Sequence, residues 1–221
     1  MLVIVTLDRS HITVKTLEDL LPEASVAGGS FGANLKHPIQ IPRNERKFVF
    51  EKAQKHAIDD CIQELCDSAG LPKSTRVETG SGGERLWPNG YVGSLTHKGT
   101  VVLAALATKS VLQALGIDIE FIDSSQLGSI EKNIAWEGVP PGTEQSNGVL
   151  LVLSAKEAVF KAQYPLTGKL LSFSDVALVW NSRGQENFSA TVESGGMIGL
   201  EVRCAHTSMW IVSAAVMPAK T

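Results

Sequence analysis

Residues 116–121 read Gly-Ile-Asp-Ile-Glu-Phe and form the strongest structural signal in the chain. Their apolar and acidic residues alternate, and a period of two is typical of a β-strand. We expect Ile117, Ile119 and Phe121 to enter a hydrophobic core while Asp118 and Glu120 lie on the other face. Two strand rises of about 3.3 Å each separate these carboxylates by roughly 7 Å. Such a pair favours a nearby cation.

A second acidic stretch lies at residues 154–162 and reads Ser-Ala-Lys-Glu-Ala-Val-Phe-Lys-Ala. Its pattern predicts a helix, on which residues four apart share a face. Glu157 and Lys161 would then be neighbours, with Leu153 and Phe160 beside them. A carboxylate on a partly apolar face is costly unless it is paired or binds a metal.

The strand and the helix together would supply three carboxylates, those of Asp118, Glu120 and Glu157. An all-oxygen site suits Mg²⁺, which keeps coordination positions open for phosphate oxygens. Lys161 would then meet the negative charge of a phosphoryl group. Each stretch alone also fits a simpler interpretation, an amphipathic edge strand and a surface ion pair worth a few tenths of a kcal/mol. Together they favour the metal site.

The composition is that of an ordinary globular protein, because 221 residues with 43% hydrophobic content can bury a sizeable core. A formal net charge of −3 gives no basic excess for binding nucleic acid or an anionic membrane. Any anion site must therefore be local. The first residues are expected to form a strand, not a signal peptide, and no apolar stretch is long enough to span a membrane. The three cysteines lack metal-ligand spacing, so we expect reduced, mostly buried thiols in a cytoplasmic protein: Cys61, Cys66 and Cys204.

The order of predicted elements indicates an α+β protein with two similar halves, residues 1–110 and 111–221, joined between Thr108 and Leu115. Besides the strand at 116–121, the pattern predicts a strand and turn over 1–14, a loop over 22–42, a helix over 44–69, strands over 91–95 and 101–107, a short helix over 124–133, a loop over 139–142, a helix over 147–164 that Pro165 ends, and antiparallel strands over 176–180, 188–192, 198–202 and 210–216.

Two further features could bind an anion. His97 lies in a predicted tight turn over residues 93–99, where backbone N–H groups and the imidazole could reach a phosphate. A histidine that bonds within its own loop is an equally good interpretation. The helix over 44–69 carries cations that form either its solvated face or a local phosphate site: Arg46, Lys47, Lys52 and Lys55.

A glycine-rich stretch at residues 80–83 reads Gly-Ser-Gly-Gly. It does not continue as Gly-Lys-Ser/Thr, so it is no P-loop. We expect a flexible connector.

Val-Gly-Ser-Leu-Thr-His at 92–97, Gly-Ile-Asp-Ile-Glu at 116–120 and the stretch 154–162, in this order and at these separations, resemble the 4′-phosphopantetheinyl transferases. The resemblance is nearest to the monomeric type that activates nonribosomal peptide, siderophore and polyketide synthases. It covers residues 43–179, including Trp-Pro-Asn-Gly at 87–90 and Pro-Leu-Thr-Gly-Lys at 165–169. It implies a pseudo-twofold α+β fold with coenzyme A in the cleft between the halves.

The resemblance also implies an activity of the holo-[acyl-carrier-protein] synthase type. Such an enzyme moves 4′-phosphopantetheine from coenzyme A to a serine of an apo acyl, peptidyl or aryl carrier protein and releases adenosine 3′,5′-bisphosphate. Asp118, Glu120 and Glu157 would hold Mg²⁺ on the pyrophosphate. Glu157 would also activate the serine, and Lys161 would stabilise the transferred phosphate. Expected contacts with coenzyme A are His97, Thr96, Arg46, Lys52, Lys55 and Lys156.

The sequence departs from the family at basic positions. Relatives often carry Arg-Arg-x-Glu-Phe on the long helix where this chain has Asn-Glu-Arg-Lys-Phe at 44–48, and some carry a lysine where this chain has Gly82. Weaker binding of coenzyme A is therefore expected. The residue that contacts the 3′-phosphate stays open among Arg46, Lys52, Lys55 and Lys98.

Two alternative functions also fit the residues. Three carboxylates and a lysine do not define the acceptor, so a metal-dependent hydrolase of a pyrophosphate is possible. The reduced basic positions are compatible with a non-catalytic protein that binds coenzyme A or a carrier. For the transferase, residues 164–169 are the expected contact with the carrier protein.

Overall fold

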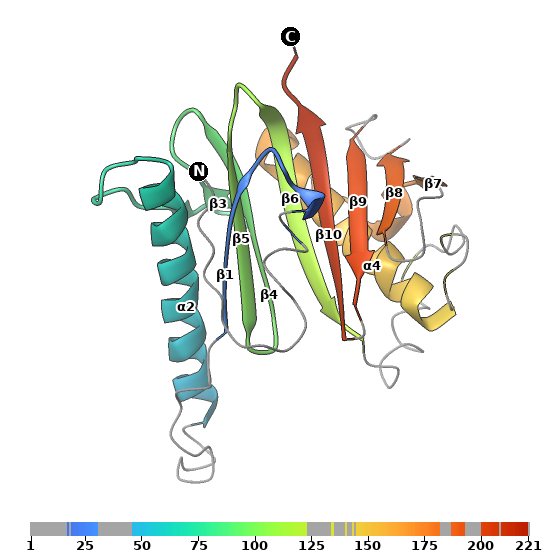
Figure 1. The fold of residues 1–221 in the computed structure, drawn as a ribbon, viewed down its shortest axis with the longest axis horizontal. Helices are drawn as coiled ribbons and strands as arrows, with labels where there is room; N and C mark the ends of the chain where they lie inside the picture. Colours follow the sequence, from blue (N-terminus) through green and yellow to red (C-terminus); the bar gives the residue numbers. More distant parts are fainter. Residues whose placement is uncertain are drawn as a thin grey trace.

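The computed structural model describes residues 17, 19–30, 46–122, 134, 140, 143, 145–181, 187–192, 200–207 and 209–220. The fold is α+β, as predicted (Figure 1). Its elements are β1 (Ser25–Ser30), α2 (Arg46–Ser68), β2 (Glu78–Thr79), β3 (Arg85–Leu86), β4 (Tyr91–Lys98), β5 (Val101–Thr108), β6 (Leu112–Phe121), α4 (Gln145–Thr167), the 3₁₀ helix η3 (Phe173–Asp175), β7 (Leu178–Asn181), β8 (Asn187–Val192), β9 (Glu201–His206) and β10 (Trp210–Pro218).

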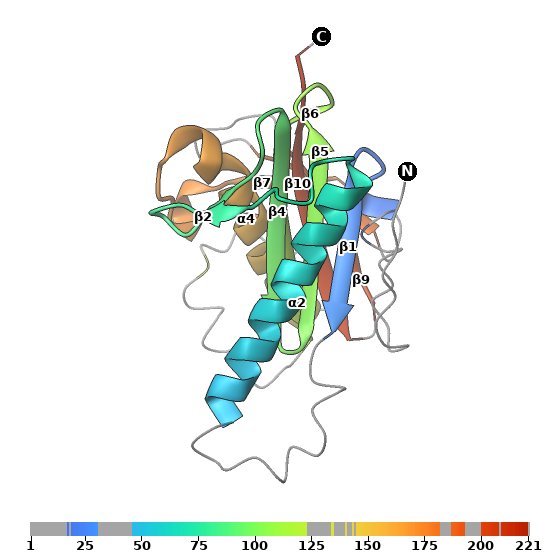
Figure 2. The ribbon, with the colours of Figure 1, turned by 90° about the vertical axis from the view of Figure 1, so that its left-hand side faces the viewer.

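Two antiparallel sheets carry the two long helices on their outer faces. The first sheet has the order β1-β5-β4 and the second has the order β6-β10-β9-β8-β7, while β2 and β3 form a separate hairpin. Helix α2 crosses the first sheet, as Figure 2 shows, and α4 packs on the second. The alternation along β5 explains this layering, since Val102, Ala104 and Leu106 pack under α2 while Leu103 and Ala105 face a core shared with the second sheet.

Strand β6 has the alternation predicted from its sequence. Ile117 and Ile119 are buried in the shared core, and Asp118 and Glu120 lie on the other face, where they line a pocket. The expected burial of Phe121 is wrong, because this ring at the end of the strand is 39% exposed. It instead contacts Trp210 edge-on, with ring centroids 5.0 Å apart.

A close contact between β6 and α4 sets the position of the acidic strand. A Cβ atom added to Gly116 would overlap the carbonyl oxygen of Ala158 and lie 2.5 Å from the backbone nitrogen of Ala162. Only a glycine facing small helix residues permits this approach. The contact places Asp118, two residues farther along the strand, opposite Lys161 of α4.

Strands β4 and β6 lie side by side but belong to different sheets, and polar side chains of β4 bridge them. The Oγ of Ser94 accepts a hydrogen bond from the N–H of residue 117 at 3.0 Å. Thr96 Oγ1 donates to Asp118 Oδ1 at 3.1 Å, and Lys98 Nζ lies 2.6 Å from Glu120 Oε2. We call Ser94, Thr96 and Lys98, with residues 117–120, the polar seam.

Strand β1 corrects the prediction of a loop over 22–42. Residues 25–30 pair antiparallel with β5, from Ser25 opposite Leu106 to Ser30 opposite Val101. The stretch reads Ser-Val-Ala-Gly-Gly-Ser, whose glycines argued against a strand. Pairing along β5 overrides that weak local preference.

Two element ends also differ from the predictions. Strand β4 continues through His97 to Lys98, so the turn begins only at Gly99, where φ is 56°. Helix α4 continues through Pro165 to Thr167, since a proline in the last turn removes a single helical hydrogen bond. Gly168, with a φ of 63°, ends the helix by donating its N–H to the carbonyl of Tyr164 at 2.8 Å.

The remaining predicted elements have different outcomes. Helix α2 and strands β5, β7, β8, β9 and β10 agree with the expected ranges to within a few residues. The predicted strand over 1–14 and helix over 124–133 lie outside the described residues, as does most of the loop over 139–142. The division into residues 1–110 and 111–221 stays a prediction. No helix among the described residues is long and apolar enough to cross a lipid bilayer.

Candidate active site

A pocket of about 500 Å³ opens where the two sheets meet. Its walls come from α2, the β2–β3 hairpin, β4, β6 and α4, so segments far apart in the sequence contribute to it. Four residues predicted for the site from both acidic stretches line it, namely Asp118, Glu120, Glu157 and Lys161. The structure therefore brings the strand and the helix to one site.

Carboxylates and lysines alternate along the pocket wall. Lys161 Nζ lies 2.6 Å from Asp118 Oδ1 and also donates to Thr96 Oγ1 at 3.1 Å. Lys98 of the polar seam pairs with Glu120. Asp118 is buried, with 5% of its surface exposed. Glu157 forms no hydrogen bond or ion pair within the described part of the chain, so its carboxylate is available to a ligand.

Burial and mutual repulsion raise the pKa values of two of the acids. For Glu157, burial is the largest cause and Asp118 adds to it, while Lys161 and Lys98 act in the opposite direction. For Glu120, burial again dominates, the hydrogen bond from Lys98 lowers the pKa, and Asp118 raises it. The two lysines thus do not fully offset the three carboxylates. An additional cation would be stabilised here.

The donor atoms are of the type that a hard divalent ion binds. All three acids offer oxygen, and Asp118 Oδ2 is buried without a hydrogen-bond partner among the described residues. However, no three His, Cys, Asp or Glu side chains in the described ranges are arranged to hold one metal ion. Lys161 and Lys98 occupy Asp118 Oδ1 and Glu120 Oε2 instead. The acids share a pocket but not a single coordination centre.

His97 lines the pocket as a strand residue rather than as a turn residue. Its Nδ1 lies 3.1 Å from Nε2 of Gln54 on α2. An amide nitrogen only donates, so with this amide orientation a neutral ring carries its proton on Nε2. Burial lowers the pKa of His97, and Lys161 and Arg85 lower it further against the effect of Asp118. The neutral ring is therefore a hydrogen-bond donor to the pocket at neutral pH.

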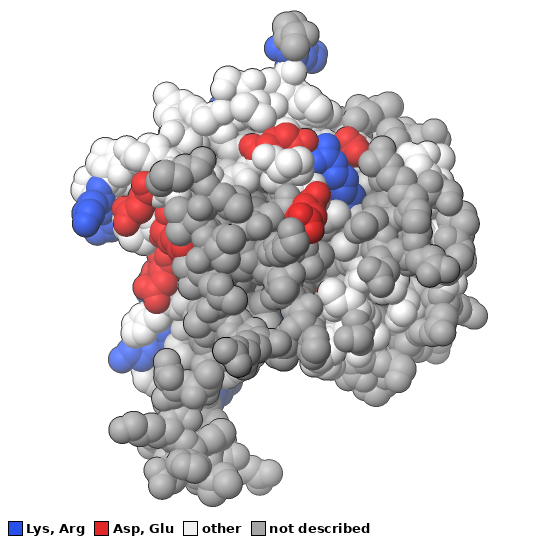
Figure 3. All heavy atoms as spheres, viewed as in Figure 1, with Lys and Arg blue, Asp and Glu red and all other residues white. Residues whose placement is uncertain are grey.

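The basic residues predicted on α2 do not line the pocket in the described structure. Lys52 and Lys55 are exposed, and Ile58 is the residue through which α2 lines the pocket. For Arg46 only the backbone is described. Acidic and basic side chains are interspersed over the described residues on the face shown in Figure 3. Lys52 and Lys55 thus belong to the exposed face of α2.

Lys156 is the clearest departure from the predicted site. Its side chain is 1% exposed and does not line the pocket. Its Nζ donates to the carbonyl oxygen of Phe173 at 2.8 Å, which ties α4 to the 3₁₀ helix η3. The expected contact of Lys156 with coenzyme A does not fit this position. The helix turns this lysine about 100° away from its neighbour Glu157.

Two features of the pocket, the position of Arg85 and the stacking of two aromatic rings, were not predicted from the sequence. Arg85 lies in a two-residue strand, too short for any periodicity. Tyr164 stacks on Phe160 with ring centroids 5.6 Å apart, and both rings line the pocket. The Trp-Pro-Asn-Gly motif could have drawn attention to Arg85, which lies two residues before Trp87.

The cysteines play no part in the pocket. All three are free and buried, as expected. Burial raises the pKa of Cys61 to about 12 and that of Cys204 to about 12. A thiol with so high a pKa is not a nucleophile at neutral pH.

Comparisons with known proteins agree with the geometry, although no protein-family model matches the chain. The 4′-phosphopantetheinyl transferase Npt of Nocardia iowensis is 33% identical over 174 residues, which are 74% of this chain and 76% of that relative. The 4′-phosphopantetheinyl transferase Svp of Streptomyces mobaraensis is 35% identical over 124 residues, 53% of this chain and 50% of the relative.

A third relative, the 4′-phosphopantetheinyl transferase PptT of Mycobacterium tuberculosis, is 27% identical over 151 residues. The matched region is 66% of this chain and 65% of that relative. The chain thus spans half to just under two thirds of the length of two of these curated relatives and about three quarters of the Nocardia protein. On the similarity to the Nocardia protein above all, the chain belongs to the 4′-phosphopantetheinyl transferase family.

Proposed function

We propose that this protein transfers 4′-phosphopantetheine from coenzyme A to a serine of an apo acyl, peptidyl or aryl carrier protein. The observation that carries the proposal is the joint placement of Asp118, Glu157 and Lys161 in one pocket, on elements that the family motifs define. The product besides the loaded carrier is adenosine 3′,5′-bisphosphate. The enzyme is of the holo-[acyl-carrier-protein] synthase type.

Mg²⁺ is part of the proposal because of the donor atoms. Asp118, Glu120 and Glu157 would hold it once Lys161 and Lys98 leave Asp118 and Glu120, and Oδ2 of Asp118 is a buried oxygen without a hydrogen-bond partner within the described residues. A bound Mg²⁺ neutralises charge on phosphate oxygens. The carboxylates of Asp118, Glu120 and Glu157 would repel a pyrophosphate beside them, and Mg²⁺ held between these acids and the phosphate oxygens would offset that repulsion.

Lys161 is proposed to stabilise the transferred phosphoryl group. An ammonium has three donors, and Asp118 and Thr96 take two of them. The third remains for a phosphate oxygen. Phosphoryl transfer through a loose transition state depends on such positioned charges more than on covalent catalysis.

Glu157 is proposed to accept the proton of the carrier serine, directly or through a water molecule. Its raised pKa and the absence of a partner in the described residues suit a general base better than Asp118, which is already paired. The serine oxygen forms a bond to the β-phosphorus of coenzyme A. The bond between this phosphorus and the bridging oxygen breaks, and adenosine 3′,5′-bisphosphate leaves with that oxygen.

The end of α4 is the proposed contact with the carrier protein. Pro165 lines the pocket, and the apolar side chains that follow are exposed, Leu166 to 46% and Leu170 to 77%. Gln163 Nε2 donates to the carbonyl of Lys169 at 2.7 Å and holds this turn in place. An apolar carrier helix docked here would bring its serine to the pocket mouth. A monomeric state and a cytoplasmic location stay predictions.

The proposal is tested by incubating the protein with coenzyme A, Mg²⁺ and a panel of apo carrier proteins and weighing each carrier. A gain of one phosphopantetheine group is expected. Asp118→Asn and Glu157→Gln should abolish the gain while the fold is retained, and Asp59→Asn, which changes an exposed acid of α2, should not. No mass gain with any carrier would contradict the proposal.

The same experiment separates the two alternatives. A pyrophosphate hydrolase would release phosphopantetheine into solution without a carrier. A non-catalytic binding protein would bind coenzyme A but convert none of it. Full activity in both Asp118→Asn and Glu157→Gln would remove the proposed metal site.

A further inference from the structure

Among the described residues, three cationic side chains line the pocket, those of Lys98, Lys161 and Arg85, and they have different partners. Lys98 and Lys161 each lie 2.6 Å from a carboxylate oxygen. The third, Arg85, donates from one terminal nitrogen to the neutral hydroxyl of Thr79 at 3.0 Å and forms no ion pair within the described residues. Arg85 therefore brings a positive charge to the pocket that no described carboxylate neutralises.

The acid nearest to Arg85 in the sequence is engaged elsewhere. Glu84 turns back onto its own loop, where Oε2 accepts the N–H of Gly82 at 3.0 Å and the carboxyl group fills the space beside Gly80. Its carboxylate is thus committed to the tip of the β2–β3 hairpin. The guanidinium of Arg85 keeps most of its five N–H donors for a ligand.

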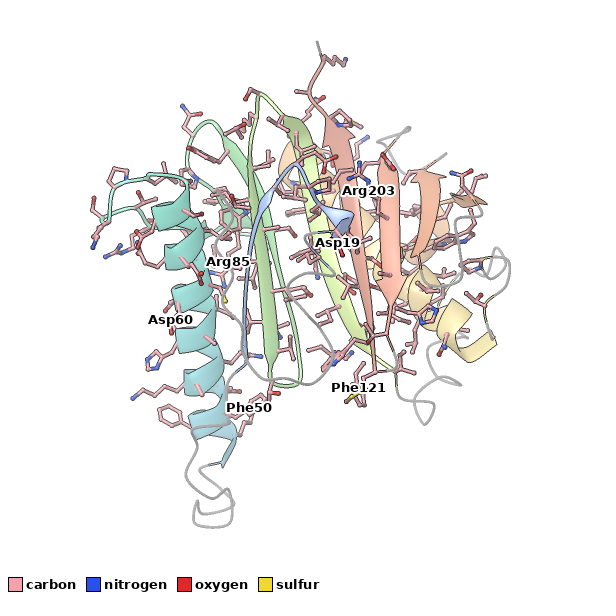
Figure 4. All side chains as sticks on the ribbon, viewed as in Figure 1. Asp19, Phe50, Asp60, Arg85, Phe121 and Arg203 are labelled. Carbon is pink, nitrogen blue, oxygen red and sulfur yellow. The ribbon has the colours of Figure 1, made fainter. Side chains whose placement is uncertain are left out.

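The hairpin holds Arg85 in a defined place. Arg85 pairs with Thr79 in the ladder of β2 and β3. On the other side of the pocket, a Cβ atom added to Gly82 would overlap the hydroxyl oxygen of Tyr164, so the hairpin tip rests on α4. Arg85, which is labelled in Figure 4, lines the same pocket as Ile58 of α2.

We propose that Arg85 binds a phosphate group of coenzyme A in this chain. The inference rests on the proposed function for the identity of the ligand. A planar guanidinium with paired N–H donors matches the geometry of phosphate oxygens. Among the sequence-based candidates, Lys52 and Lys55 do not line the pocket, and Lys98 is paired with Glu120.

The position of Gly82 agrees with this assignment. A long side chain at residue 82 would need the space that the Tyr164 hydroxyl occupies. The cation of the hairpin is instead three residues farther along, in β3. Coenzyme A and its 3′-dephospho form share a diphosphate, so comparing the two ligands tells which phosphate Arg85 contacts.

Calorimetric titration of the full chain with coenzyme A and Mg²⁺ tests the proposal. Arg85→Gln should weaken binding at least tenfold, and Arg85→Lys, which keeps the charge without the fork, should recover part of the loss. Lys109→Gln removes one exposed cation outside the pocket and should change binding less than twofold. Thr79→Val removes the hydrogen bond to Arg85 but keeps the charge, so it should also have a small effect.

The ligand comparison assigns the phosphate. A loss confined to coenzyme A supports a contact with the 3′-phosphate, and an equal loss for 3′-dephospho-coenzyme A supports a contact with the diphosphate. Binding by Arg85→Gln equal to that of Lys109→Gln overturns the proposal. An equal loss in Thr79→Val overturns it too, because a loosened hairpin would then explain the effect. A loss seen only with Lys52→Gln or Lys55→Gln assigns the contact to α2 instead.

Failure of this inference is distinguishable from failure of the proposed function. Arg85-dependent binding without transfer to any carrier would retain Arg85 and reject the transferase. Transfer by the wild type together with unchanged coenzyme A binding by Arg85→Gln would retain the transferase and reject the role of Arg85. A wild type that does not bind coenzyme A would overturn both.

Discussion

Replacing Gly116 with alanine should separate the acidic strand β6 from helix α4. The new methyl group would overlap the carbonyl oxygen of Ala158 and lie 2.5 Å from the backbone nitrogen of Ala162. Both atoms belong to the backbone of α4, which cannot turn aside as a side chain can. The strand and the helix must move apart instead.

The size of the effect follows from these distances. Ordinary contact begins near 3.4 Å, so β6 must retreat by more than about 1 Å, and the overpacking should cost about 1–3 kcal/mol of stability. The same retreat would lengthen the 2.6 Å contact between Lys161 Nζ and Asp118 Oδ1 beyond hydrogen-bonding range. A misplacement of this size commonly costs about a hundredfold in rate. We therefore expect kcat to fall about a hundredfold.

The assay compares kcat for carrier loading with stability from urea unfolding. Gly90→Ala is the matched control, because Gly90 has a φ of 85° and no atom within 4 Å of an added Cβ. That variant should lose about 1–2 kcal/mol through backbone strain alone and keep its kcat. If Gly116→Ala turns over within twofold of Gly90→Ala, the spacing between β6 and α4 does not set the geometry of the site.

Three other substitutions test separate parts of the structure. Burial raises the pKa of Glu157, so its charged form destabilises the fold. Glu157→Gln should therefore be more stable than the wild type at pH 7, measured by urea unfolding without divalent cations. This gain should vanish below about pH 4, where the carboxyl group of the wild type is protonated in both the folded and the unfolded state. Lys156→Met should lose about 1–3 kcal/mol by removing the hydrogen bond from Nζ to the Phe173 carbonyl, with coenzyme A affinity unchanged in calorimetry. A selective loss of affinity would return Lys156 to the site. Leu170→Asp should raise KM for the carrier without changing the melting temperature or the affinity for coenzyme A, and an unchanged KM would place the carrier elsewhere.

The parts of the fold that the sequence predicts well are those with a strong period. The alternation of residues 116–120 identified the faces of β6, and long amphipathic or apolar runs identified α2 and α4. The same periods put Asp118 and Glu120 on one face of the strand and Glu157 beside Lys161 on the helix, and the structure places all four in one pocket. These predictions depend only on local geometry, which sequence spacing determines.

The features that sequence reasoning missed depend on tertiary contacts. Strand β1 exists because β5 offers it a partner, and its own residues carry little preference for a strand. Lys156 was expected to contact coenzyme A, but packing against η3 buries it. Arg85 reaches the pocket only because a short hairpin folds across to α4. None of these contacts can be predicted from the spacing of residues in the sequence.

The polar seam has a consequence for how a metal ion is gained. With Lys161 on Asp118 and Lys98 on Glu120, the protein supplies its own counter-ions to the acids. A divalent cation bound as proposed would compete with these two ammonium groups, so its affinity would be the difference between two sets of charge pairings. Each displaced lysine is then released beside the negative charge of the arriving diphosphate. Metal and nucleotide should therefore strengthen each other's binding, and neither alone should bind tightly.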